Sequence, residues 1–210
     1  MKQNSTLIAL VLDRSGSMYG VREETMSAVN AYLDEQRKQG GECQIVFTQF
    51  NDRVQVERVA ELHDFPVLGS PALPYEPHGW TALYDAVGTT IDLVARQIKE
   101  WPEEKRPEFV IFVVQTDGQE NASREYTKES VRALVEANEK QGWAFLFLGA
   151  DQNAWEQGHA MGIGTTYSYD KTSAQSVYDI ASVDTTQVRA GKKLLKIDKD
   201  LRTKKPGATS

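Results

Sequence analysis

The segment Thr-Leu-Ile-Ala-Leu-Val-Leu-Asp-Arg-Ser-Gly-Ser-Met, residues 6–18, joins an apolar run to a short polar loop. Its first part, residues 6–12, is almost continuously hydrophobic, which is typical of a strand buried on both faces of a sheet. Three further runs, at residues 44–50, 109–115 and 143–148, have the same character. We therefore expect them to form the centre of a parallel sheet that helices cover on both sides.

Longer stretches between these runs repeat their apolar residues at helical spacing. Helices are expected at residues 21–38, 83–101, about 125–140, 154–161 and from about 172. Residues 54–59 alternate apolar and polar after the turn-forming pair Asn51-Asp52, which predicts an antiparallel edge strand, and a weaker strand is expected at 165–169. The segment 63–79 has four prolines and predicts an irregular loop. The fold class is thus α/β, a Rossmann-like doubly wound sheet of six mainly parallel strands with one antiparallel edge strand and helices on both faces.

The length and the charge pattern limit the classes of protein. A chain of 210 residues fits one domain, which we place at 1–190, because single cores reach roughly 250–300 residues. Residues 191–210 hold seven lysines and arginines against two aspartates and form a basic tail, predicted to be partly disordered. This tail carries a charge of +5, so residues 1–190 carry −11 and the net charge is −6. An acidic body argues against nucleic-acid and membrane partners. The single cysteine, Cys43, and the lack of a signal peptide or spanning segment predict a cytoplasmic protein.

Several familiar motifs are missing or incomplete. Gly162-Ile-Gly164 begins like a dinucleotide-binding fingerprint but lacks its third glycine, and there is no P-loop or nucleophile elbow. The three histidines have no metal-type spacing, so we interpret them as solvated loop residues. Cys43, at the start of a strand, is interpreted as a small buried hydrophobic residue. Cofactor binding by these routes is therefore not expected.

The loop after residues 6–12 carries oxygen-bearing side chains at alternate positions. Asp13, Ser15 and Ser17 can be an ordinary polar turn, or they can direct three oxygen ligands toward a hard cation such as Mg²⁺ or Mn²⁺. In a doubly wound sheet, the strand neighbouring the first one is the fourth, at 109–115, and its end delivers Asp117 to the same edge. Two carboxylates are then expected to meet there.

Thr81 is a further candidate ligand. It enters the predicted helix at 83–101 after Gly79-Trp80, and its hydroxyl either caps that helix or faces the same edge of the sheet as Asp13.

Taken together, these motifs resemble the metal-ion-dependent adhesion site of von Willebrand factor type A domains. The resemblance rests on Asp13-x-Ser15-x-Ser17, Gly79-x-Thr81 and Thr116-Asp117-Gly118, in that order, and covers residues 5 to about 170. It implies that Ser15 and Ser17 bind the ion directly, that Thr81 does so when a ligand is engaged, and that Asp13 and Asp117 act mainly through bound water. Leu148-Gly-Ala-Asp151 and Met161-Gly-Ile163 are similar to intracellular, single-domain bacterial and phage-type members.

The sequence leaves two main functional hypotheses, because a third, a nucleic-acid-associated factor that acts through the basic tail, is opposed by the acidic body. The first is a non-enzymatic, Mg²⁺- or Mn²⁺-dependent protein-binding module, an adaptor or scaffold component, whose ion accepts an Asp or Glu side chain from a partner protein. Tyr19, Tyr75 and Trp80 would then lie near the ion, either as an exposed aromatic rim or partly buried against the loops. The alternative is a metal-dependent hydrolase or phosphatase in which Asp13, Asp117 and Glu120 orient a water molecule. The predicted site holds no histidine or lysine to act as a general base, which favours the binding module.

Overall fold

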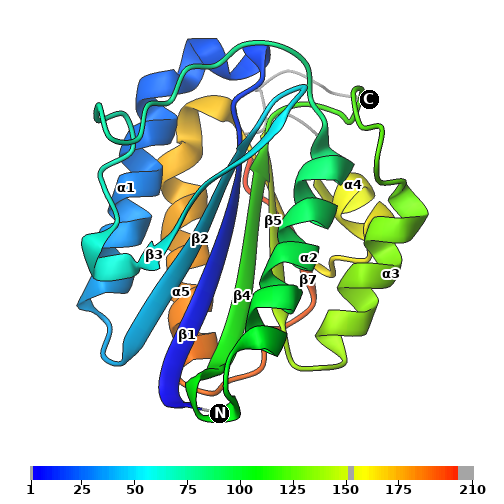
Figure 1. The fold of residues 1–210 in the computed structure, drawn as a ribbon. Coiled ribbons are helices and arrows are strands. Elements are labelled where there is room, and N and C mark those ends of the chain that lie inside the picture. The colour runs from blue at the N-terminus through cyan, green and yellow to red at the C-terminus, as the bar shows by residue number, and fades with distance from the viewer. Residues whose placement is uncertain (1, 151–153, 203–210) are drawn as a thin grey trace.

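The first strand, β1 (Lys2–Asp13), lies in the middle of the sheet (Figure 1). It runs parallel to β2 (Glu42–Phe50) on one side and to β4 (Pro107–Thr116) on the other. The computed structural model describes residues 2–150 and 154–202. The near-continuous burial of β1 follows from this central position, as the hydrophobic run at residues 6–12 predicts.

Seven strands form one sheet in the order β3-β2-β1-β4-β5-β6-β7. The remaining strands are β3 (Val54–Glu61), β5 (Ala144–Ala150), β6 (Thr165–Tyr169) and β7 (Ile197–Asp200). β3 is antiparallel to β2 at one edge and all other pairs are parallel, so the predicted doubly wound topology and its antiparallel edge are confirmed.

The prediction of six strands is wrong by one. β7 comes from the segment that we assigned to the basic tail, and it pairs with β6 at the second edge. All four of its residues are exposed, and only Ile197 is apolar. A strand that buries so little side-chain surface carries almost no hydrophobic pattern, which is why the sequence did not indicate it. Residues 203–210 lie outside the described part of the chain.

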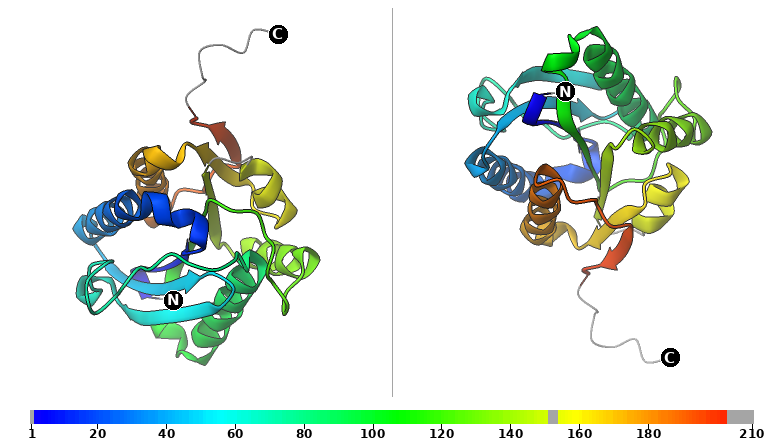
Figure 2. Two further views of the ribbon diagram at one scale, coloured as in Figure 1. Left: turned by 90° about the horizontal axis from the view of Figure 1, so that it is seen from above. Right: turned by 90° about the horizontal axis from the view of Figure 1, so that it is seen from below.

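Helices cover both faces of the sheet (Figures 1 and 2). The five α-helices are α1 (Arg22–Lys38), α2 (Leu83–Glu100), α3 (Lys128–Glu139), α4 (Ala154–Ala160) and α5 (Ala174–Arg189). Short 3₁₀ turns are η1 (Gly16–Val21), η2 (Leu62–Asp64), η3 (Glu103–Lys105) and η4 (Lys171–Ser173). α1 and α5 pack on one face, while α2, α3 and α4 pack on the other. None of the described helices is both long and apolar enough to cross a membrane.

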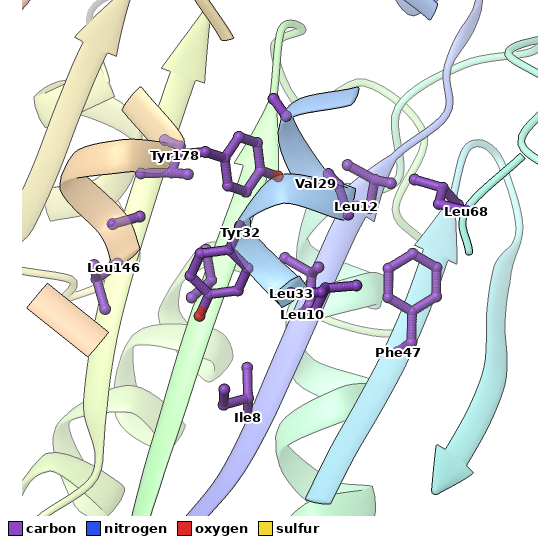
Figure 3. Close-up of a cluster of buried hydrophobic side chains, with 14 of the residues drawn as sticks. Ile8, Leu10, Leu12, Val29, Tyr32, Leu33, Phe47, Leu68, Leu146 and Tyr178 are labelled. Atoms are coloured by element: carbon purple, nitrogen blue, oxygen red, sulfur yellow. The ribbon is translucent and has the colours of Figure 1, made fainter. Parts of the chain in front are cut away.

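The two faces of β1 belong to different cores because successive side chains of a strand point to opposite sides. Ile8, Leu10 and Leu12 pack with Tyr32 of α1 and Tyr178 of α5, as Figure 3 shows. The intervening residues of β1 pack against α2 and its neighbours. Both cores hold β1 rigidly, and its carboxyl end is therefore a fixed point of the molecule.

The predicted irregular loop is tied to the body of the protein. Between η2 and α2 the chain forms only an isolated bridge between Ser70 and Leu73. The Asn30 side chain of α1 accepts a hydrogen bond from the Leu68 amide and donates one to the Leu68 carbonyl, at 2.9 and 3.1 Å. The loop thus reaches the carboxyl edge of the sheet in a defined path.

Candidate metal centre

Asp13 and Asp117 meet where β1 and β4 end side by side. Asp13 is the last residue of β1, and Asp117 follows Thr116, the last residue of β4. The register pairs Leu12 with Gln115, so both chains leave the sheet at the same level. The topology therefore brings together the two carboxylates that the sequence placed at this edge.

Asp13 is a fully buried carboxylate with two hydrogen-bond donors. The Ser15 amide donates to its Oδ1 at 2.6 Å, and the Thr116 hydroxyl donates to its Oδ2 at 2.5 Å. Burial raises the pKa of Asp13 to about 6, although these hydrogen bonds act in the opposite direction. The negative charge is thus costly at this position, and a nearby cation would stabilise it.

The two serines link the first loop to Asp117. Ser15 Oγ and Ser17 Oγ share a hydrogen bond of 3.0 Å, and Ser17 Oγ donates to Asp117 Oδ1 at 2.5 Å. Ser15 is buried, whereas Ser17 is exposed. The linked hydroxyl groups therefore extend from the protein interior, at Ser15, to the solvent-exposed surface, at Ser17.

Thr81 approaches from the third loop. α2 begins at Leu83 with Ala82 at the N-cap position and no side-chain cap, so the interpretation of Thr81 as the cap is wrong. Its backbone is held by Asn121: the Thr81 amide donates to Asn121 Oδ1 at 2.9 Å, and the Asn121 amide donates to the Thr81 carbonyl at 3.0 Å. A Cβ on Gly118 would lie only 2.9 Å from Thr81 Oγ1, so glycine leaves room for this hydroxyl beside Asp117.

Backbone hydrogen bonds fasten the loops to one another. The Gly16 amide donates to the Gly79 carbonyl at 3.0 Å, and the His78 amide donates to the Arg14 carbonyl at 2.9 Å. The Asn51 side chain, from the turn between β2 and β3, donates to the His78 carbonyl at 3.0 Å. Contacts outside the side chains of the candidate ligands therefore also fix the positions of these loops.

A lysine also reaches the cluster, contrary to the expectation that the site holds no histidine or lysine. Lys171 Nζ, from η4 after β6, lies 3.0 Å from Asp117 Oδ2. The contact pairs the ammonium group with a carboxylate that the metal-binding hypothesis also uses. No sequence pattern indicates this contact, because the two partners are 54 positions apart and Lys171 belongs to no local motif.

Thr116 is a second residue that sequence reasoning missed, although it lies within the quoted Thr116-Asp117-Gly118 motif. Its hydroxyl donates to Asp13 and accepts from the Gly118 amide at 3.1 Å, which joins the two loops. A polar residue at the end of an otherwise apolar strand is the signal that could have indicated it.

Glu120, which the hydrolase hypothesis assigned to a water molecule, holds the loop instead. Its carboxylate accepts hydrogen bonds from the Tyr84 amide at the start of α2 and from the Ala122 amide, both at 2.9 Å. It also accepts from the amide and the hydroxyl of Ser123, both at 2.7 Å. Both carboxylate oxygens are therefore used to fix the path of the chain.

The predicted aromatic rim is present for two of its three members. Tyr19 and Trp80 are 74% and 68% exposed. Tyr75 is buried, and its hydroxyl donates to the Asp13 carbonyl at 2.7 Å, so it holds the backbone of Asp13 from the protein interior. A surface pocket beside Tyr19 is lined in part by Arg22 and Glu76.

The donor set fits a hard divalent ion. Within the described residues, no three His, Cys, Asp or Glu side chains group together to hold a metal. The oxygen atoms gathered here come instead from two carboxylates and several hydroxyls, which are the ligand types that Mg²⁺ accepts. The ammonium group of Lys171, which lies beside Asp117, shows that the cluster already stabilises positive charge. Asp151, which contributed to the resemblance, lies outside the described residues.

Comparisons with known proteins give matches in structure only. No protein-family model matches the sequence, and no curated protein matches it. The chain is similar to the von Willebrand factor domain of the type V pili tip protein Mfa5 from Porphyromonas gingivalis, with a TM-score of 0.63 and 7% identity over 92% of this chain and 98% of that one. A von Willebrand factor type A protein from Catenulispora acidiphila gives a TM-score of 0.59 and 14% identity over 88% of this chain and 43% of that one.

A third similar structure is the PilB minor pilin from Streptococcus sanguinis, with a TM-score of 0.63 and 11% identity over 91% of this chain. The chain spans 63% of that pilin and less than half of the Catenulispora protein. At such identities the likeness concerns the fold, and it agrees with the strand order and the helix layers described above. The chain therefore has the fold of a von Willebrand factor type A domain.

Proposed function

We propose that the protein is a Mg²⁺- or Mn²⁺-dependent protein-binding module, an adaptor or scaffold component that captures an Asp or Glu side chain of a partner. The observation that carries the proposal is the convergence of Asp13, Ser15, Ser17 and Asp117 at the sheet edge. Several of the similar structures come from pili, which supports a role in protein interaction. A cytoplasmic location is part of the proposal, and cell fractionation tests it.

The ion would be bound directly by the hydroxyls of Ser15, Ser17 and Thr81. The carboxylates of Asp13 and Asp117 would act on it mainly through bound water. Because most of these donors are neutral, a bound dication keeps enough positive field to accept one more anionic oxygen. Ser17 is exposed and marks the side from which a partner can approach. The exposed rings of Tyr19 and Trp80 supply apolar contact area around that approach.

Calorimetric titration with Mg²⁺ and Mn²⁺ tests the metal dependence. We expect one site per chain in the wild-type protein and none in the double variant Ser15→Ala/Ser17→Ala. The two substitutions remove only hydroxyl oxygens, so the fold should remain intact by circular dichroism. Equal titrations of both proteins would contradict the assignment of the ligands.

Partner capture in Mg²⁺ and in EDTA tests the second half of the proposal. Immobilised wild-type protein should retain a partner only with the ion, and the double-serine variant should retain none. Replacing the acidic residues of the captured partner one at a time should then identify a single Asp or Glu that is required. Capture that persists in EDTA would contradict the carboxylate mechanism.

A further inference from the structure

Lys171 reaches the candidate metal centre from a segment that supplies none of the candidate ligands. η4 follows β6, two strands away from β4, and its first residue places an ammonium group 3.0 Å from Asp117 Oδ2. The Asp117 side chain is fully buried, and the Lys171 side chain is 28% exposed. The contact is therefore shielded from solvent on the carboxylate side.

Asp117 is shared between this ammonium and the proposed ligands. Its Oδ1 accepts the Ser17 hydroxyl, while its Oδ2 faces Lys171. The carboxylate therefore lies between a fixed positive charge and the hydroxyl cluster. Any divalent ion held by Ser15 and Ser17 would interact with the same carboxylate and would be repelled by the lysine.

The balance of charge shows what this arrangement does. Asp13 and Asp117 contribute two negative charges, and Lys171 offsets one of them. Charges in a partly buried site are poorly screened by salt and interact more strongly than exposed ones. A loaded centre would thus carry net positive charge, which disfavours the ion alone but favours the ion together with an added carboxylate.

We propose that Lys171 is a built-in cation that competes with the divalent ion for Asp117 and so makes ion binding depend on the acidic partner. The inference rests on the proposed function and adds a regulation of the same centre. Two ligands that each favour the binding of the other are coupled, and such coupling is commonly about 5- to 150-fold in affinity. The lysine would set the size of that coupling.

Lys171→Met tests this role, because methionine keeps most of the aliphatic side chain and removes the charge. Calorimetric titration with Mn²⁺ alone should show an affinity on the order of tenfold higher than that of the wild-type protein. Lys171→Arg keeps the charge and should stay close to wild type. The matched control is Lys196→Met, which removes a lysine paired with Glu139 at 2.8 Å on a different part of the surface and should leave the affinity unchanged.

A thermal measurement gives a second readout that does not depend on heats of binding. Removing the lysine leaves Asp117 buried without this cation, which destabilises the metal-free protein and increases the stabilisation that an added ion provides. The rise in melting temperature on adding Mn²⁺ should therefore be larger for Lys171→Met than for wild type. Circular dichroism in EDTA establishes that each variant is folded.

The outcomes separate this inference from the proposed function. If the wild-type protein binds Mn²⁺ and Lys171→Met binds it no more tightly, the role of Lys171 is overturned while the metal centre stands. If only Lys171→Met binds the ion, the competition is supported and the proposed metal dependence of the natural protein fails. If neither binds, both are overturned.

Discussion

At the scale of single residues, Asp13 meets a structural demand and, in the proposed function, a demand of metal binding. Its carboxylate ties the Ser15 amide and the Thr116 hydroxyl together, but its burial makes the charged form unfavourable. Asparagine has nearly the same shape, can accept from the Ser15 amide with its oxygen, and can donate to Thr116 with its nitrogen. The two demands can therefore be separated by one substitution.

We expect Asp13→Asn to abolish Mg²⁺ binding while leaving the metal-free protein at least as stable as wild type. Relief of the buried charge is worth on the order of 1–3 kcal/mol, which offsets the weaker hydrogen bonds. Urea unfolding in EDTA and in Mg²⁺ measures both effects. A variant that loses more than about 1 kcal/mol in EDTA would show that the hydrogen bonds dominate.

Thr81→Ala should weaken partner capture more than it weakens ion binding. Thr81 is held through its backbone by Asn121, so truncation of the side chain leaves the loop in place. If the hydroxyl binds the ion only when an acidic ligand docks, its loss costs partner affinity about 5- to 150-fold, the usual size of a coupling between two ligands.

The comparison needs Mg²⁺ titration and Mg²⁺-dependent capture on the same protein samples. Thr81→Ser, which keeps the hydroxyl, is the control and should behave like wild type. A parallel drop in ion affinity and partner affinity for Thr81→Ala would argue that Thr81 is an ordinary ligand in every state.

At this scale the sequence predicted the site residues that lie at strand ends, but it did not predict contacts made by residues from distant parts of the chain. Asp13 and Asp117 are brought together by strand order, which follows from the hydrophobic runs together with the order typical of a doubly wound sheet. Lys171 meets Asp117 only because of the exact path of the chain after β6, and no periodicity records such a contact. Tyr75 was expected in a possible rim, but its buried hydroxyl contact with Asp13 depends on the course of an irregular loop.

At the scale of elements, α2 is locked to the loop that carries Asp117. Asp85, in the first turn of α2, accepts hydrogen bonds from the amides of Arg124, Glu125 and Tyr126 at 2.7 to 2.9 Å. The Tyr126 ring then packs over Gly88, and its hydroxyl donates to Asp92 at 2.6 Å. One helix therefore positions both Thr81 at its start and the chain that follows Asp117.

Gly88→Ala should destabilise the protein, although alanine is the better helix former. A Cβ at this position would lie 2.3 Å from the Tyr126 ring, and such overlap costs about 1–3 kcal/mol against a helix-propensity gain of about 1 kcal/mol. We expect a lower urea midpoint.

The double variant Gly88→Ala/Tyr126→Ala provides the control for this prediction, because it removes the ring that the new methyl group meets. The cost of Gly88→Ala should be smaller in the Tyr126→Ala background, and a thermodynamic cycle measures the difference. Equal costs in both backgrounds would mean that the clash is not with Tyr126.

The elements themselves were largely predictable because burial leaves a pattern. β1, β2, β4 and β5 are central strands and read as apolar runs, while the alternation at 54–59 indicated an edge strand, β3. β7 was missed because it is exposed on all four residues and is held to β6 by backbone pairing. Backbone pairing is open to nearly every residue type and leaves only a weak pattern in the sequence.

At the scale of the whole molecule, a thiol and several phenol groups buried on one face of the sheet make the protein less stable at alkaline pH. Burial raises the pKa of the Cys43 thiol to about 11 and raises the pKa values of Tyr32, Tyr75 and Tyr178 well above that of a free tyrosine. The folded state therefore keeps these protons at pH values where the unfolded chain releases them. Stability is full below the unfolded pKa values and decreases as the pH rises above them.

The free energy of unfolding should change little just above neutral pH, once Asp13 is ionised in the folded protein, and fall above about pH 9, where cysteine and then tyrosine ionise in the unfolded chain. Tyr178→Phe removes one of these groups and a buried hydroxyl with no hydrogen-bond partner among the described residues. The variant should be more stable at pH 7 by up to about 1–3 kcal/mol and should lose less stability at pH 10. Urea titrations at both pH values test this, and a steeper alkaline loss in Tyr178→Phe would contradict it.

The place of β1 in the sheet has a mechanical consequence. A partner held at Ser15 and Ser17 would pull on the carboxyl end of β1, along the axis of the strand. β1 is bonded to β2 and β4 on both sides in parallel register, so the two ladders would be loaded in shear and their bonds would have to break together. An edge strand such as β3 would instead peel away one bond at a time. The proposed site of attachment would thus load a strand that is paired on both sides.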